Sequence, residues 1–82
     1  MKLPRNLSGQ DLVHLLKKYG YIVTRQTGSH IRLTTERNGI HHLTIPAHDP
    51  LRVGTLAKIL TEVAIHLQIT RDELLLDTKL NL

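Results

Sequence analysis

The spacing of apolar residues predicts a helix near each end of the chain. Leucines recur at intervals of three and four residues between Gly9 and Tyr19, with Ser8 placed to cap the first turn and Gly20 placed to end the last. A cleaner stripe at i, i+3, i+4, i+7 and i+11 marks a second helix: Leu56, Ile59, Leu60, Val63 and Leu67. Both patterns are typical of helices that bury one face in a core.

A short third helix is predicted from the capping box Thr70-Arg71-Asp72-Glu73 and continues through Leu74-Leu75-Leu76. One face of this helix can pack on the second helix. Three consecutive leucines exceed what one face needs, so the surplus favours a contact with a second copy of the chain or with a partner protein.

Between the two long helices, the residues favour extended structure and predict three strands: Tyr21–Gln26, His30–Thr35 and Ile40–Ile45. Thr27-Gly28-Ser29 forms the first turn, and Asn38-Gly39 is a hairpin signal because both residue types accept a positive φ. Pro46 ends the third strand because it has no N–H to donate to a ladder.

The order α-β-β-β-α predicts a two-layer α+β domain, with a three-stranded antiparallel sheet and the helices on one face. We expect one domain over residues 1–82, with its core in residues 8–69 and a short helix and tail over residues 70–82. A three-residue hairpin loop sets Leu33 opposite Leu43 and Ile31 opposite Ile45 on the covered face. The other face stays open and collects polar side chains: His30, Arg32, Thr34, His42 and Thr44.

Composition narrows the functional classes. The chain has no cysteine, which excludes disulfides and thiolate zinc sites. It has 11 Lys and Arg against 7 Asp and Glu, a net charge of +4, which favours an anionic partner and also fits ordinary solubility charge. Two tyrosines are its only aromatic residues besides histidine, too few for a platform that stacks bases. No segment resembles a membrane span or a signal peptide, so we expect a soluble cytoplasmic protein.

The segment Gly28-Ser29-His30-Ile31-Arg32 carries the candidate chemistry. Alternate residues of a strand share a face, so His30 and Arg32 point the same way. A neutral imidazole can take the proton of a ribose 2′-hydroxyl, and a cation can stabilise the charge that builds on the attacked phosphate. Backbone N–H groups near Gly28 and Ser29 can add anion contacts. The same pattern, taken without other information, also fits exposed strand residues with no chemical role.

Other basic residues leave alternatives open. His42, on the open face, can contact RNA or supply the acid for the leaving oxygen. His30 acting through water is the other candidate for that acid. Lys17 and Lys18 can hold a phosphate backbone, although their pattern favours plain solvated charge.

The remaining histidines are weaker candidates. We expect His14 at the surface, His41 partly buried, His48 in a loop without a role, and His66 at a helix C-terminus where its charge suits the dipole. A zinc site from His41, His42 and His48 is disfavoured by the irregular ligand spacing.

Several motifs in one order resemble the HicA (YcfA-like) toxins over about residues 8 to 65: Gly28-Ser29-His30, the Asn-Gly hairpin, His42-Leu43-Thr44-Ile45-Pro46, and Gly54-Thr55-Leu56 with Ile59-Leu60. The fold of that family resembles a double-stranded-RNA-binding domain. Its members are small ribonucleases that cleave mRNA and are neutralised by a HicB antitoxin. The loop over residues 48–52 and the helix from Thr70 depart from its shortest members.

The resemblance implies an mRNA-cleaving endoribonuclease without metal or cofactor, in which His30 is the catalytic residue of the Gly-Ser/Thr-His motif. It also implies a HicB-like antitoxin as partner, and it leaves open a homodimer or a hetero-oligomer with that antitoxin. The alternative is a non-catalytic RNA-binding module in which His30 and Arg32 only contact phosphates. A weaker alternative is an interaction domain recruited by an acidic protein.

Overall fold

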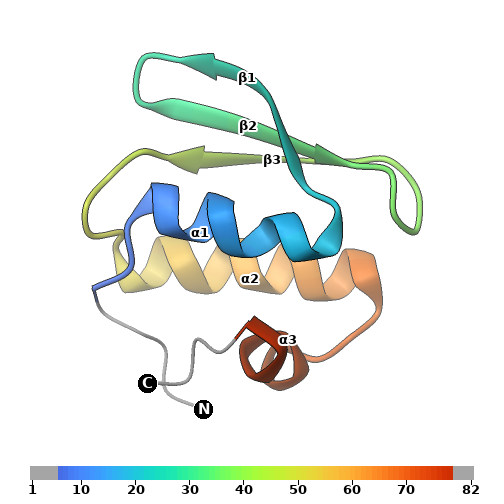
Figure 1. Cartoon of the computed structure of the whole chain (residues 1–82). Coiled ribbons are helices and arrows are strands. Elements are labelled where there is room, and N and C mark those ends of the chain that lie inside the picture. The colour runs from blue at the N-terminus through green and yellow to red at the C-terminus, as the bar shows by residue number, and fades with distance from the viewer. Residues whose placement is uncertain (1–5, 79–82) are drawn as a thin grey trace.

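The computed structural model describes residues 6–78, and side chains as far as residue 74 (Figure 1). Its elements are α1 (Gly9–Leu16), the 3-10 turn η1 (Lys17–Tyr19), β1 (Ile22–Thr27), β2 (His30–Thr35), β3 (His41–Pro46), α2 (Val53–Leu67) and α3 (Arg71–Thr78). The sheet forms one layer, the helices lie on one of its faces, and α3 lies beyond them (Figure 1). The predicted two-layer α+β order is confirmed.

Local signals account for the helix ends. The hydroxyl of Ser8 accepts from the Asp11 N–H at 3.0 Å, and the Asp11 carboxylate accepts from the Ser8 N–H at 3.1 Å, which completes a capping box. The last turn tightens into η1 and stops at Gly20, whose φ of 81° suits glycine. A second capping box joins Thr70 and Glu73 at the start of α3, as predicted.

The sheet has the order β1-β2-β3 and is antiparallel throughout. Leu33 lies opposite Leu43 and Ile31 opposite Ile45, which confirms the predicted register. The hairpin loop differs in one detail, because Asn38 (φ 59°) as well as Gly39 (φ 97°) takes the left-handed conformation. Asparagine tolerates this region better than most residues, so the Asn-Gly signal fits a turn with two such positions.

The core lies between the covered face of β2 and β3 and the apolar stripes of α1 and α2. Leu12 and Leu16 of α1 are fully buried, as is Leu60 of α2. Leu74 of α3 is also fully buried, so the third helix contributes to the core. The side chains of Leu75 and Leu76, on which the surplus-leucine hypothesis depends, lie outside the described part of the chain.

β1 differs from the other strands because all six of its residues are exposed. It is an edge strand, and a bulge between Val23 and Arg25 shifts its pairing with β2. Bulges bend and twist a strand locally, and here the bulge decides which β1 side chains share the open face.

Candidate nucleic-acid interface

His30 stands at a corner of the open face of the sheet. It follows the two-residue turn Gly28-Ser29, in which Gly28 has a φ of 56° at the first central position, as a type II′ turn requires. The Ala47 N–H donates to the Ser29 carbonyl at 2.6 Å and ties this turn to the segment after β3. The His30 side chain is exposed, as predicted. The turn therefore holds the histidine at the edge of the molecule, where a large ligand can reach it.

A row of three side chains crosses the open face next to His30. Arg32 pairs with Arg25 of β1 on one side and with Thr44 of β3 on the other, and all three are exposed. Two arginines directly opposite each other repel, and this costs stability unless an anion lies near them. The row is two residues along β2 from His30, about 7 Å away. It is the strongest positive feature of this face.

Sequence reasoning missed Arg25. The hydrophobic pattern specifies the β2–β3 register but not the β1–β2 register, because β1 is exposed. The turn Gly28-Ser29 fixes the β1–β2 register near His30. Counting outward from that two-residue turn pairs position 25 with position 32, so the signal was present in the sequence. The bulge beyond Arg25 does not disturb this part of the pairing.

A chain of hydroxyl groups holds His42 on the same face. The hydroxyl of Thr24 lies 3.0 Å from that of Thr34, which lies 2.8 Å from Nδ1 of His42. The register pairs Thr34 with His42, whereas His30 pairs with Pro46. Four residues of strand separate the two histidines, about 13 Å. This backbone spacing argues against His42 as the acid for a phosphate held at His30, and the role of His42 on this face stays a prediction.

The structure does not bring Lys17 and Lys18 to this site. They lie in η1, at the opposite end of the helical layer from the β1–β2 turn (Figure 1). The carbonyl of Tyr19, next to them, accepts from the hydroxyl of Thr35 at 3.1 Å, and Thr35 is the last residue of β2. A contact of these lysines with RNA would therefore be separate from the surface around His30.

Of the other four histidines, two are exposed and two belong to the packing of the fold. His14 and His48 are exposed, as expected, and the His48 carbonyl accepts from the Gly9 N–H at 2.8 Å. His41 is partly buried on the covered side, and its ring stacks on that of His66 with 4.5 Å between centroids. The Tyr21 hydroxyl lies 2.7 Å from Nδ1 of His41.

Hydrogen bonds hold both rings of the stacked pair in place. Burial, helped by the Glu62 carboxylate, raises the pKa of Tyr21 to about 12, so its hydroxyl stays protonated and shares a hydrogen bond with Nδ1 of His41. Nε2 of His66 lies 2.9 Å from the carbonyls of both Arg37 and Gly39, so this nitrogen must carry a proton and donate. The contact joins the β2–β3 hairpin to the C-terminus of α2.

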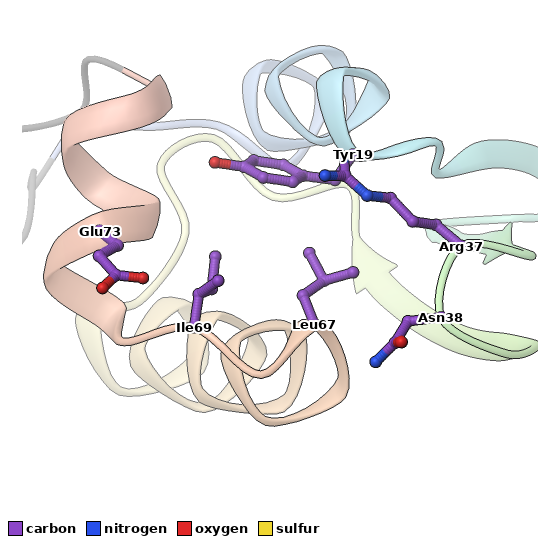
Figure 2. A pocket seen from close by; sticks show the side chains of 6 residues that line it. All are labelled: Tyr19, Arg37, Asn38, Leu67, Ile69 and Glu73. Carbon is purple, nitrogen blue, oxygen red and sulfur yellow. The ribbon is translucent and has the colours of Figure 1, made fainter.

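Two of the hollows on the described part of the surface bear on the site. One, of about 450 Å³, lies between β3 and α2. The other, of about 250 Å³, lies between η1, the hairpin and α3. Figure 2 shows Tyr19 and Arg37 on one side of it and Leu67, Ile69 and Glu73 on the others. None of its residues was a predicted site residue. Among the side chains described, those of residues 6–74, no group of three His, Asp or Glu is placed to hold a metal ion.

A three-stranded antiparallel sheet, with helices on one face and a polar, partly basic open face, is the arrangement of a small domain that resembles a double-stranded-RNA-binding domain. Residues 9–65 match the family model described as the HicA toxin of bacterial toxin–antitoxin systems. This match covers well over half of the chain, which therefore belongs to the HicA toxin family.

No curated protein and no solved structure matches the chain with significance. Over residues 6–78, no helix has the length and apolarity needed to span a bilayer.

Proposed function

We propose that this chain is an endoribonuclease that cleaves mRNA without a metal ion, with His30 as the general base. The observation that carries the proposal is the exposed imidazole of His30, which a tight turn holds beside the Arg25–Arg32 pair. The pair supplies positive charge where the RNA backbone would lie. Membership of the HicA toxin family supports the same activity.

In the proposed reaction, the imidazole of His30 takes the proton of a ribose 2′-hydroxyl. The 2′-oxygen attacks the adjacent phosphorus, the bond from phosphorus to the 5′-oxygen breaks, and the products carry a 2′,3′-cyclic phosphate and a 5′-hydroxyl. The proton returns from the imidazolium, directly or through water, to the leaving oxygen. The guanidinium of Arg32 and the N–H groups near Gly28 and Ser29 stabilise the charge that develops on the phosphate. None of these steps requires a metal ion.

The proposed setting is the cytoplasm, where mRNA is the substrate and a HicB-like antitoxin is the partner. An inhibitor that covers the open face would exclude RNA from His30 without any change in the fold. This arrangement accounts for a catalytic residue that lies exposed rather than in a deep cleft.

The test compares wild type, His30→Ala and the matched control His14→Ala, whose histidine is exposed on α1. Each protein is purified and incubated with single-stranded RNA, with and without a chelator, and each is also expressed in growing cells. We expect cleavage, growth arrest and loss of mRNA with wild type and the control, unchanged by chelation. His30→Ala should bind RNA and leave it intact. Growth arrest by both wild type and His30→Ala with the RNA left intact would instead identify a non-catalytic RNA-binding module, and equal cleavage by both would show that His30 is not the base.

A further inference from the structure

The groove between β3 and α2 is a second surface that the chemistry at His30 does not use. It opens along the free edge of β3, because the strand order leaves β3 at the side of the sheet. Seven residues line it: His42, Leu43, Thr44, Thr55, Lys58, Ile59 and Glu62. Its volume of about 450 Å³ lies within the range of small-molecule sites, about 300–1,000 Å³.

The lining selects the kind of ligand. Leu43 and Ile59 belong to the buried core and give the groove an apolar floor. The rim carries both donors and acceptors, since Lys58 can only donate, Glu62 can only accept, and the hydroxyls do both. The charges of Lys58 and Glu62 cancel, and a carboxylate disfavours a phosphate here. A flat, uncharged ring with donors and acceptors around its edge, that is, a nucleobase, matches this lining.

His42 at the rim is held in one orientation. Its Nδ1 is fixed by Thr34, which in turn is fixed by Thr24, so three strands contribute to the position of one ring. Bonds between exposed side chains add little to stability, because ordering those side chains costs entropy. Their effect here is to present the imidazole at the mouth of the groove.

The groove begins at Thr44, where the row formed by Arg25, Arg32 and Thr44 ends. Thr44 lines the groove and pairs with Arg32, which itself pairs with Arg25. An RNA backbone that contacts the two arginines can therefore turn a base over the edge of β3 into the groove.

We propose that the β3–α2 groove binds one unpaired base of the RNA strand and sets a base preference near the cleaved bond. This inference rests on the proposed function, which it deepens by assigning the site that reads the substrate. A single bidentate base contact gives a preference between about fivefold and a hundredfold.

The first test maps cleavage sites on random-sequence single-stranded RNA for wild type, Glu62→Gln, Lys58→Met and the control Glu36→Gln, which changes an exposed residue outside the groove. Wild type and the control should share a preference for one base at one fixed distance from the cut. Glu62→Gln and Lys58→Met should weaken or change the preference while cleavage continues. A preference that is identical in all four proteins would overturn the proposal.

The second test needs no cleavage. Isotope-labelled His30→Ala protein is titrated with adenosine, guanosine, cytidine and uridine, which lack a phosphate. The amides of Leu43, Thr55 and Ile59 should shift most with one nucleoside, and Glu62→Gln should reduce the shift. If wild type fails to cleave but the nucleosides shift these amides, the nuclease proposal fails and the base site stands. If no nucleoside shifts these amides, the base site is overturned. It is also overturned if an antitoxin strand protects the β3 amides from hydrogen exchange and the nucleosides do not compete with that strand.

Discussion

His41 and His42 are neighbours in the sequence and belong to different parts of the molecule. His42 lies on the open face, where hydroxyl groups orient it and solvent reaches it. His41 lies on the covered side, between the Tyr21 hydroxyl and the ring of His66. A histidine such as His41, whose ring packs on another ring and whose nitrogen is hydrogen-bonded inside the protein, contributes to stability. One that stands exposed beside repelling arginines, as His30 does, is available for a ligand.

This comparison predicts that the open face and the hairpin–α2 contact respond oppositely to mutation. Changes on the open face should alter RNA binding or cleavage without lowering stability. Changes at the contact of His41 and His66 should lower stability and leave cleavage by the folded protein unchanged.

The largest effect is expected at His30. His30→Gln removes the proposed base and should lower single-turnover cleavage by about 10²–10⁴-fold. The exposed side chain has no packing to lose, so the free energy of unfolding should stay within about 0.5 kcal/mol of wild type. Cleavage assays and urea unfolding of the same preparations check both parts. A variant that loses stability as well as activity would place His30 among the structural histidines and break the comparison.

His66→Ala should show the reverse. The substitution removes the N–H group that donates to the carbonyls of Arg37 and Gly39. It also removes the ring that stacks on His41. We expect a loss of about 0.5–1.5 kcal/mol in the free energy of unfolding, the net contribution of a typical hydrogen bond, because water can reach the carbonyls that lose their donor. The control His48→Ala changes an exposed loop residue and should stay close to wild type. Cleavage per folded molecule should be unchanged in both, and a specific loss of cleavage in His66→Ala would contradict this assignment.

The covered half of the fold could be predicted because burial enforces one register. Leu33 and Leu43 must share a face with Ile31 and Ile45, and a slip by one residue would expose them. The Gly28-Ser29 turn then places His30 on the open face. These elements depend on local pattern and on one buried surface, which the sequence specifies strongly.

The arrangement around His42 could not be predicted in the same way. Its hydroxyl chain depends on the bulge in β1, which brings Thr24 to the open face, and no hydrophobic pattern marks an exposed strand. The contact of His66 with the hairpin joins residues nearly thirty positions apart. Such contacts follow from how helices and loops meet, which local sequence does not encode.

Substitution of Arg25 should have smaller effects, which raise stability and weaken RNA binding. Arg25→Gln removes the repulsion with Arg32, so stability should rise by about 0.2–1 kcal/mol. It also removes one phosphate contact, so the slope of log affinity against log salt should fall by about 0.7 for single-stranded RNA. Filter binding at several salt concentrations and urea unfolding measure the two changes. Lys17→Gln, at the other end of the molecule, is the matched control. An equal fall in slope for both variants would show that RNA binds by diffuse charge rather than along the open face.

The smallest effect is the pH dependence that His41 gives to stability. Burial, with the neighbouring His66 and His42, lowers the pKa of His41 below its usual 6.5, while the Glu62 carboxylate opposes the shift. Between 6.5 and the lowered value, the unfolded chain binds more protons than the folded protein at this residue. Stability should therefore fall as the pH drops through that window, and His41 should contribute no slope above it.

Urea unfolding of wild type and His41→Phe from about pH 8 to about pH 5 isolates this contribution, because the titrations of the other histidines occur in both proteins. Phenylalanine keeps a ring against His66 but removes both the titration and the hydrogen-bond partner of the Tyr21 hydroxyl. The variant should be less stable than wild type at the higher pH, and the difference should shrink as the pH falls. Parallel pH profiles would show that the stacked histidines carry no proton linkage and act through packing alone.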